Sequence, residues 1–437
     1  MSISNQARTA LLLLLAGLIW LAGQAQANPA EMLDAPSWET EPPGRLLSVN
    51  ATLGADRPVV RVAPNGQLLV VFNQFTSMAG DKLPDPYYTL SNDNGQSWST
   101  PAPLYQSNGV TSLYTTFTYN SSSVAHAVWV ENLSLVYARQ GDWPGITRTL
   151  SDPEDIPGAL HPQIVSSGSS TLDVVWAEGD LADPGAYVPS IRHTRSTNNG
   201  NTWTNSTIPP SPYNASYPSL AVGTGGKLHL AWEDTLLAEY RIYYTEGTAL
   251  GNAVSWSEPV LISGDLTTAR RPQLLVNGNS VIVTFTRRTA DEEQWIYHTE
   301  CNGQCLNANS WDTPSIISGQ KVGVNSDDPT VLVSSMMRLG ACTFVYFHGT
   351  QPSAPPPFNE NEILWGVNSC DGWGAIRDQV TATDVRSLYP VLAASSQYVH
   401  LVYERAVNND RQIYYMRAVP PPNINAPVFL PFMAKSQ

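Results

Sequence analysis

The chain has little positive charge and none of several common catalytic signatures. It contains 23 Lys and Arg against 37 Asp and Glu, a formal net charge of −14. Because phosphate backbones require a cationic surface, we expect no nucleic-acid partner. The sequence lacks a G-x-S-x-G elbow, an H-E-x-x-H helix and a phosphate-cradling glycine loop. These absences disfavour serine-hydrolase, zinc-protease and nucleotide-binding chemistry, and we expect no cofactor.

Cysteine is also scarce, with four residues in the whole chain. The spacing of Cys301 and Cys305 lacks the second close pair, or the histidines, of a zinc finger, so we expect no metal site. In an exported protein such cysteines form disulfides. We favour the pairs Cys301–Cys305 and Cys342–Cys370, and the two other connectivities stay open.

Long hydrophobic runs are limited to the two ends. Arg8, the apolar run 10–22 and Ala25-Gln26-Ala27 are typical of a signal peptide over 1–27, which predicts a secreted protein. An uncleaved anchor is the alternative, but the run is shorter than the roughly 20 residues that span a bilayer, so we expect no transmembrane segment in the mature chain. The segment 420–437 joins three prolines to a short apolar tail. This tail is a docking strand, a sorting or surface-attachment signal, or a disordered end.

What the sequence does contain is an internal repeat of roughly 45–55 residues. Each unit opens with a residue followed by proline, continues through two apolar strands and a strand rich in Ile and Tyr, and closes with a Trp-containing strand. Four antiparallel strands per unit predict an all-β propeller over 28–419. We count seven blades, the last completed by a strand from 38–49. Six remain if the weak outer half of the second unit is misinterpreted.

Two eight-residue stretches carry a well-defined turn motif. In Ser91-Asn92-Asp93-Asn94-Gly95-Gln96-Ser97-Trp98, the Asp93 carboxylate can accept backbone N–H bonds and Gly95 can adopt positive φ. The stretch 196–203 repeats the pattern with Asn in place of Asp; its motif positions are Ser196, Asn198, Gly200 and Trp203.

This motif resembles the Asp box of the sialidase (BNR-repeat) superfamily. The resemblance implies a propeller whose Asp boxes are structural turns between the two outer strands, away from the catalytic face. Sialidases have six blades, so the preferred count of seven departs from the enzyme pattern.

The repeat topology selects residues at the opposite rim, near the propeller axis. Residues before proline on the first strands and residues that end the second strands must crowd this rim. The first set is Arg57, Tyr114, His161, Tyr217, Arg271, Asp328 and Tyr389; the second includes Glu178, Glu233, Arg287, Arg288, Glu404 and Arg405. Arginine forks and aromatic faces suit acidic sugars. Alternatively, each Glu is a solvated strand end or pairs with an Arg of a neighbouring blade.

The resemblance also suggests catalytic roles. Sialidases use three arginines for the substrate carboxylate, a Tyr nucleophile with a Glu partner, and an Asp acid. Carried over to this chain, Tyr389 is the nucleophile, Glu233 its partner, and Asp81 or Asp85 the acid. Arg57, Arg271 and Arg287 or Arg288 form the triad. Arg57 adjoins Pro58 directly, whereas the family places its arginine two residues before proline, so this correspondence is inexact.

Three functions are compatible with these observations. The preferred one is a secreted, sialidase-like propeller that binds glycans or glycoconjugates at its axial rim as a divergent or non-catalytic relative of the enzymes. The second is an active exo-α-sialidase-type glycoside hydrolase. The third is a protein-docking propeller with a cell-surface partner, suggested by the proline-rich loop 349–361.

Overall fold

The structure is a computed structural model of the chain. It describes residues 36–40, 42–49, 53–76, 83–107, 109–151, 158–179, 190–210, 214–236, 239–288, 294–318, 333–339, 342–349, 362–368, 378–381, 385–407 and 410–420. Several predictions fall outside these residues: the signal peptide 1–27, Asp81, Asp328, the loop prolines 355–357, Cys370 and the tail from 421.

The described chain is almost entirely β. Its helices are the short 3₁₀ turns η1 (Thr224–Gly226) and η2 (Ala308–Ser310). No helix in the described ranges has the length and apolar character needed to cross a membrane.

The described strands form seven antiparallel sheets. The first four contain, in order, β3 (Ala55–Val62), β4 (Leu68–Phe75), β5 (Pro84–Ser91) and β6 (Ala102–Pro103); β7 (Ser112–Tyr119), β8 (Ala125–Glu131), β9 (Ser134–Arg139) and β10 (Arg148–Thr149); β11 (Ala159–Ser166), β12 (Leu172–Glu178), β13 (Ser190–Ser196) and β14 (Thr204–Ser206); and β15 (Asn214–Val222), β16 (Leu228–Leu236), β17 (Glu239–Leu250), β18 (Ala253–Trp256) and β19 (Val260–Leu261).

The remaining three sheets follow the same plan. They contain β20 (Ala269–Asn277), β21 (Ser280–Arg288), β22 (Gln294–Asn302) and β23 (Ser315–Ile316); β24 (Ser334–Leu339), β25 (Cys342–Gly349), β26 (Glu362–Asn368) and β27 (Asp378–Gln379); and β28 (Ser387–Ala394), β29 (Val399–Val407) and β30 (Asp410–Val419) with β1 (Ser37–Trp38) and β2 (Arg45–Leu46). In this last sheet Ser37 lies opposite Val419 and Arg45 opposite Tyr415.

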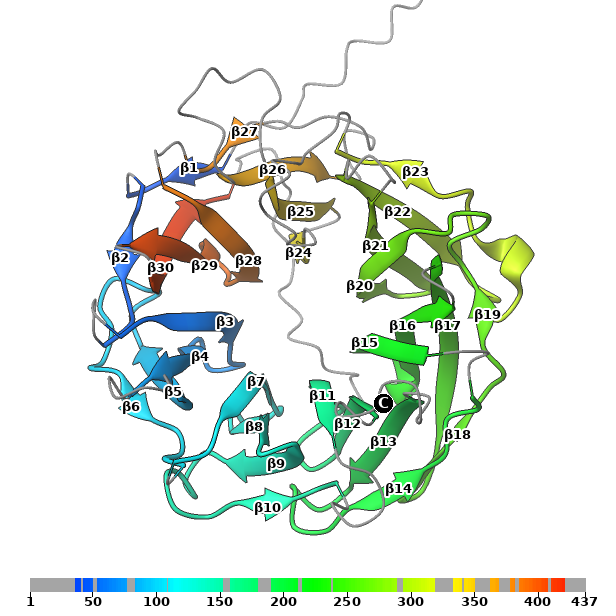
Figure 1. The fold of residues 1–437 in the computed structure, drawn as a ribbon, viewed down its shortest axis with the longest axis horizontal. Coiled ribbons are helices and arrows are strands. Elements are labelled where there is room, and N and C mark those ends of the chain that lie inside the picture. The colour runs from blue at the N-terminus through cyan, green and yellow to red at the C-terminus, as the bar shows by residue number, and fades with distance from the viewer. Residues whose placement is uncertain are drawn as a thin grey trace, which may run out of the picture. The chain divides into compact units, whose positions relative to one another are not determined.

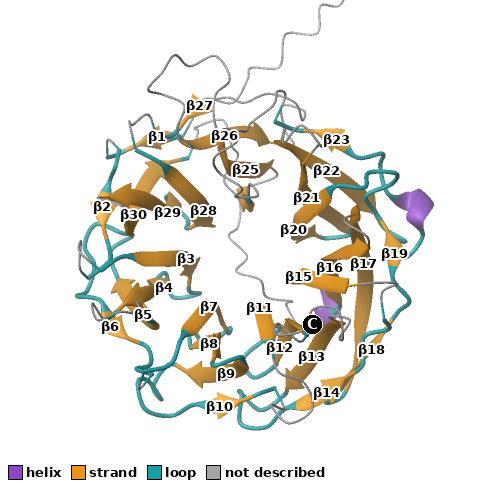
Figure 2. Cartoon of the chain, viewed as in Figure 1, coloured by secondary structure: helices purple, strands orange, loops and turns teal. Residues whose placement is uncertain are grey.

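The sheets surround a common axis. Their innermost strands contact one another in the order β3, β7, β11, β15, β20, β24, β28 and back to β3, as Figures 1 and 2 show. The prediction of an all-β propeller with four-stranded antiparallel blades is therefore confirmed.

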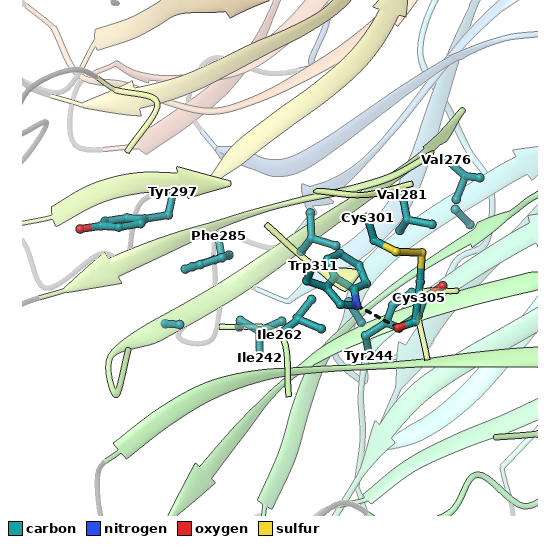
Figure 3. Packing of buried hydrophobic residues seen from close by; sticks show 14 residues of the cluster. Ile242, Tyr244, Ile262, Val276, Val281, Phe285, Tyr297, Cys301, Cys305 and Trp311 are labelled. Atoms are coloured by element: carbon teal, nitrogen blue, oxygen red, sulfur yellow. Dashed lines mark hydrogen bonds between the residues drawn. A yellow bond between two sulfur atoms is a disulfide. The ribbon is translucent and has the colours of Figure 1, made fainter. Parts of the chain in front are cut away.

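The hydrophobic core lies between neighbouring sheets. Figure 3 shows the cluster between the sheets of β17 and β21, where Tyr244 and Phe285 are buried beside Trp311. Trp311 donates its indole N–H to the Cys305 carbonyl at 2.8 Å, and Cys305 is bonded to Cys301. The predicted Cys301–Cys305 disulfide is confirmed. Cys342 is also disulfide-bonded.

The Asp-box turns lock one sheet onto the next at one end of the strands. The Ser97 N–H donates to the Asp93 carboxylate at 2.8 Å, and the Gly95 N–H donates to the Ser91 hydroxyl at 2.8 Å. The bonds from Ser97 hold the pKa of Asp93 at about 2. Trp98 packs edge-on against Tyr415 of the neighbouring sheet, with ring centroids 4.8 Å apart.

The second turn makes the same joint with an amide in place of the carboxylate. The Thr202 N–H donates to the Asn198 side-chain oxygen at 2.8 Å, and the Gly200 N–H to the Ser196 hydroxyl at 2.9 Å. Trp203 packs against Tyr137 at 5.0 Å. Both motifs are thus structural turns, as the resemblance implies.

Candidate functional site

At the end away from the Asp-box turns, the innermost strands share a repeated backbone irregularity. Six non-glycine residues there have φ between 49° and 58°, and each lies where the pairing of the first and second strands shifts register. They are Arg57, Tyr114, His161, Tyr217, Arg271 and Tyr389. All but Tyr114 precede a proline, a position that normally favours extended backbone. Each left-handed residue costs about 1–2 kcal/mol, and such strain clusters at functional sites.

Side chains from the preceding sheet hold three of these bulges in place. The Arg57 N–H donates to Glu404 Oε1 at 2.7 Å, and the Arg271 N–H donates to Glu233 Oε2 at 2.9 Å. The Tyr389 N–H makes a longer bond to His348 Nδ1, at 3.4 Å. The buried ends of second strands therefore position the bulges of the next sheet, which is the structural alternative raised for Glu233 and Glu404.

The side chains of five bulge residues form a continuous stack across five sheets, here called the arginine–aromatic arc: Arg57, Tyr114, His161, Tyr217 and Arg271. The Arg57 guanidinium lies over the Tyr114 ring at 4.2 Å, and Tyr114 meets His161 edge-on at 4.5 Å. His161 stacks on Tyr217 at 3.7 Å, and Arg271 lies over Tyr217 at 3.8 Å.

Within the arc, the Tyr217 ring has neighbours on both of its faces. Two groups within 4 Å of one ring centroid must lie on opposite faces, so His161 and Arg271 cover both faces of Tyr217. The aromatic faces of the rim were expected to suit sugars, but the Tyr217 ring has no face left for one. Its hydroxyl and the guanidinium groups remain the polar features of this part of the arc.

Polar groups in the arc have few protein partners. Arg271 Nε and His161 Nδ1 are buried without a hydrogen-bond partner among the described residues. Burial, with the charges of Arg271 and Arg57, holds the pKa of His161 well below its usual range. His161 is thus neutral between the two flanking arginines. The arc is cationic at both ends.

Tyr389 belongs to a second group, on β28, which lies next to the β3 strand that carries Arg57. Its ring lies 5.1 Å from that of His348 and 5.7 Å from the Arg411 guanidinium. Arg411 in turn bonds to Glu404 at 3.0 Å. Burial and Glu404 raise the pKa of Tyr389, outweighing the opposing effect of nearby arginines. The phenol is therefore protonated, whereas a nucleophilic Tyr requires a lowered pKa.

Glu233, the predicted partner of Tyr389, interacts with two other residues. Glu233 is buried, bonds to the Arg271 N–H and forms an ion pair with Arg270 at 3.4 Å. Glu404 is the carboxylate that acts on Tyr389, and its own pKa is raised to about 7 by burial and by Asp56.

Three other predicted rim residues bond or pack within their own sheets. Glu178 pairs with Arg192 at 2.7 Å. Arg287 donates to the Tyr297 hydroxyl at 3.2 Å, and Arg405 lies 5.7 Å from the Tyr414 ring. Arg288 ends β21.

Asp85, a candidate acid, is bound to neighbouring side and main chains. It is buried, and its carboxylate accepts the Ser107 N–H at 2.9 Å and the Thr76 hydroxyl at 3.2 Å. These bonds tie Asp85 to Thr76, which follows β4, and to Ser107, which follows β6.

Arg411 is the rim residue that the sequence did not indicate. It lies on the third strand of its sheet, opposite Ala406, whereas the predicted rim residues all come from first and second strands. The pairing of β29 with β30 is the signal that would have placed it beside Glu404. Within the described ranges, no group of three or more His, Cys, Asp or Glu could hold a metal ion.

Comparisons with known proteins identify the fold. No family model and no curated protein matches the chain. A protein of unknown function from Dyadobacter fermentans is similar in structure, with a TM-score of 0.51 and 12% identity, covering 88% of this chain and all of that one. The NanB sialidase of Streptococcus pneumoniae, as a K499G mutant, has a TM-score of 0.48 and 12% identity over 88% of this chain and 71% of its own.

A third similar structure is the Trypanosoma rangeli sialidase in complex with the inhibitor DANA. Its TM-score is 0.47 and its identity 9%, over 83% of this chain and 55% of its own. The chain is an all-β propeller. At these identities the likeness concerns the fold.

Proposed function

We propose that this protein is a secreted propeller that binds acidic glycans or glycoconjugates at the bulge end of its axis. The observation that carries the proposal is the arginine–aromatic arc, in which Arg57 and Arg271 flank three rings supplied by three further sheets. Guanidinium forks bind carboxylates and sulfates through paired hydrogen bonds. Stacking fixes the forks before a ligand arrives, which reduces the entropy lost on binding.

The extracellular location belongs to the same proposal. The Cys301–Cys305 disulfide suits an oxidising compartment. The N-terminal pattern of Arg8 followed by an apolar run supports export.

Screening the purified protein against an array of acidic and neutral glycans tests this function. We expect the wild type to retain acidic glycans and Arg271→Ala to lose them, because the variant removes one guanidinium of the arc. Arg45→Ala is the matched control, since Arg45 is exposed and donates to the Gln96 carbonyl in an Asp-box turn at the other end of the strands. Equal retention by all three proteins would refute the proposal.

One observation favours exo-sialidase activity as a second candidate. Arg57, Arg271 and Arg411 all act electrostatically on Tyr389, and Glu404 lies in the same group. Hydrolysis of a fluorogenic sialoside, measured with Tyr389→Phe alongside, tests it. Turnover that Tyr389→Phe abolishes would establish the enzyme. Because the raised pKa of Tyr389 disfavours a nucleophile, we expect folded wild-type protein to show no turnover.

A further inference from the structure

Three pairs of neighbouring sheets are joined at the Asp-box end by the same three kinds of side chain. In each joint a buried His bonds to a Tyr hydroxyl on the next strand, and that Tyr ring meets a Trp of the following sheet edge-on. The His–Tyr bonds measure 2.7, 2.6 and 2.8 Å, and the ring centroids of Tyr and Trp lie 5.0, 4.9 and 4.8 Å apart. In that order, the joints contain His126 with Tyr137 and Trp203, His229 with Tyr244 and Trp311, and His400 with Tyr415 and Trp98. Two of these Trp residues close the Asp-box turns, whereas Trp311 closes the turn shown in Figure 3.

The turn before Trp311 lacks the side-chain acceptor of the Asp box. The first residues of the three turns are equivalent, because each lies opposite the residue four positions before the buried aromatic of its second strand; they are Ser91, Ser196 and Cys301. Two positions further on, the boxes have Asp93 and Asn198, whereas the third turn has Gly303. Gly303 and Gln304 also carry the left-handed backbone of this turn, one position earlier than in the boxes. Because glycine has no side chain to accept an N–H, another interaction must hold this turn closed.

The disulfide lies where the Asp boxes have a hydrogen bond. In the first box the Gly95 N–H donates to the Ser91 hydroxyl at 2.8 Å, and the second box has the same bond at 2.9 Å, each between residues four positions apart. The bond between Cys301 and Cys305 joins the same two positions of the third turn. Since the left-handed residues lie one position earlier here, position 305 can carry a side chain where the boxes require glycine.

The disulfide also fixes the acceptor for the Trp311 indole. Trp311 donates its indole N–H to the Cys305 carbonyl at 2.8 Å, and in the second Asp box Trp203 donates to the carbonyl of Gly200, the equivalent residue, at 3.2 Å. The third turn is longer because it contains η2 before the Trp. A longer turn without an Asp or Asn acceptor still places Trp in the joint, and the covalent bond is what sets the position of the carbonyl that holds it.

We infer that the Cys301–Cys305 disulfide is a covalent substitute for the Asp box, and that the joint between the sheets of β17 and β22 depends on the oxidation of these two cysteines. Oxidation proceeds by exchange with a disulfide donor: the donor's S–S bond breaks, its two sulfurs leave as thiols with the two cysteine protons, and one S–S bond forms in the chain. The two cysteines are 0% and 2% exposed, so a reductant reaches the bond only when the joint opens. A chain in a reducing compartment would thus have two tight joints and one loose one. The inference is independent of glycan binding.

Hydrogen–deuterium exchange of the full protein, followed by mass spectrometry, tests this inference. The peptides compared are those that contain Tyr244 and Trp311, from the disulfide joint, and those that contain the two Asp boxes. In Cys301→Ala/Cys305→Ala we expect exchange in the first pair to become at least about tenfold faster, because the turn is no longer held, and exchange in both boxes to stay within about twofold of the wild type. Unchanged exchange around Trp311, or an equal rise in all three joints, would overturn the inference.

A second variant tests whether the disulfide and the Asp-box hydrogen bond are equivalent. Cys301→Ser/Cys305→Gly places the hydroxyl and the glycine of the boxes at the two equivalent positions. We expect its exchange around Trp311 to lie between those of the wild type and Cys301→Ala/Cys305→Ala, because the serine hydroxyl can accept the glycine N–H. Exchange as fast as in the double alanine variant would show that the disulfide does not stand in for that bond.

Reduction of the wild type gives the same test without a substitution, should either variant fail to fold. Dithiothreitol supplies two electrons and two protons to the disulfide and becomes a cyclic disulfide itself. We expect it to speed exchange around Tyr244 and Trp311 and to leave both Asp boxes unchanged. Cys342, which is also disulfide-bonded, begins β25, so its reduction should appear in peptides from β25. Faster exchange in β25 alone, with the Cys301–Cys305 bond reduced, would overturn the inference.

Discussion

Neighbouring sheets are joined by different kinds of contact at the two ends of the blades. At the Asp-box end, the Tyr415 hydroxyl bonds to buried His400 at 2.8 Å and its ring packs on Trp98. The Tyr137 hydroxyl makes the equivalent hydrogen bond with His126 Nδ1, at 2.7 Å. At the bulge end, sheets meet through strained backbone and stacked cations, with Arg271 Nε left unpartnered among the described residues.

We therefore expect one end to contribute mainly to stability and the other mainly to ligand binding. The Asp-box end combines closely hydrogen-bonded turns with large buried rings, which is where substitutions should unfold the protein. The bulge end retains strain and unused donors, which a ligand can compensate. Substitutions at each end should therefore change different observables.

We expect the largest loss of stability from Gly95→Ala. A Cβ at this position would lie 1.8 Å from the Tyr415 hydroxyl, and φ is +82°. Steric overlap and the left-handed backbone together predict a loss of about 3 kcal/mol in the free energy of unfolding. Urea denaturation measures it.

Gly66→Ala is the matched control, because φ is +87° there but nothing lies within 4 Å of the added Cβ. We expect it to lose about 1–2 kcal/mol, the cost of the backbone conformation alone. Equal losses in the two variants would show that the close contact with Tyr415 is not what constrains Gly95.

A smaller effect concerns acid stability. Burial lowers the pKa of His400 to about 3. Below pH 6.5 the unfolded chain therefore binds a proton at this residue that the folded chain does not, so stability falls as the pH drops. This histidine contributes about 1.4 kcal/mol per pH unit. Urea unfolding of His400→Gln at pH 6 and pH 5 should show a slope shallower by that amount, and an unchanged slope would contradict the assignment.

The smallest effect is a pH dependence of glycan affinity that originates at Glu404. This residue faces Asp56, Arg57, Arg411 and Tyr389. Its pKa of about 7 means that it becomes protonated as the pH falls from 8 to 6. Loss of this negative charge favours an anion at Arg57, so acidic glycans should bind roughly threefold more tightly at pH 6 than at pH 8. Glu404→Gln should abolish the difference in a calorimetric titration. If the pH dependence persists in the variant, Glu404 is not its source.

How much of this could be predicted from sequence differs between the two ends. The Asp-box turn is local in the chain, so residues 91–98 alone indicate its hydrogen bonds. The rim residues could be selected too, because strand topology brings Arg57, Tyr217 and Arg271 to one end.

The contacts among the rim residues could not be predicted. Proline after Arg57 favours extended backbone, yet φ there is +53° because the Glu404 carboxylate of another sheet accepts the Arg57 N–H. The stacking of His161 on Tyr217 likewise depends on the rotation between two sheets. No pattern within either repeat encodes that rotation, so the sequence could indicate which residues gather but not how they pair.

The most direct test of the central claim is the acidic-glycan array repeated with the Arg57→Ala/Arg271→Ala double variant. Its far-UV circular dichroism should match that of the wild type, because the variant removes two cation–π contacts but no hydrogen bond or ion pair between a guanidinium and another described residue. The account predicts that the double variant folds but retains no acidic glycan. A folded double variant with the wild-type binding pattern would contradict it.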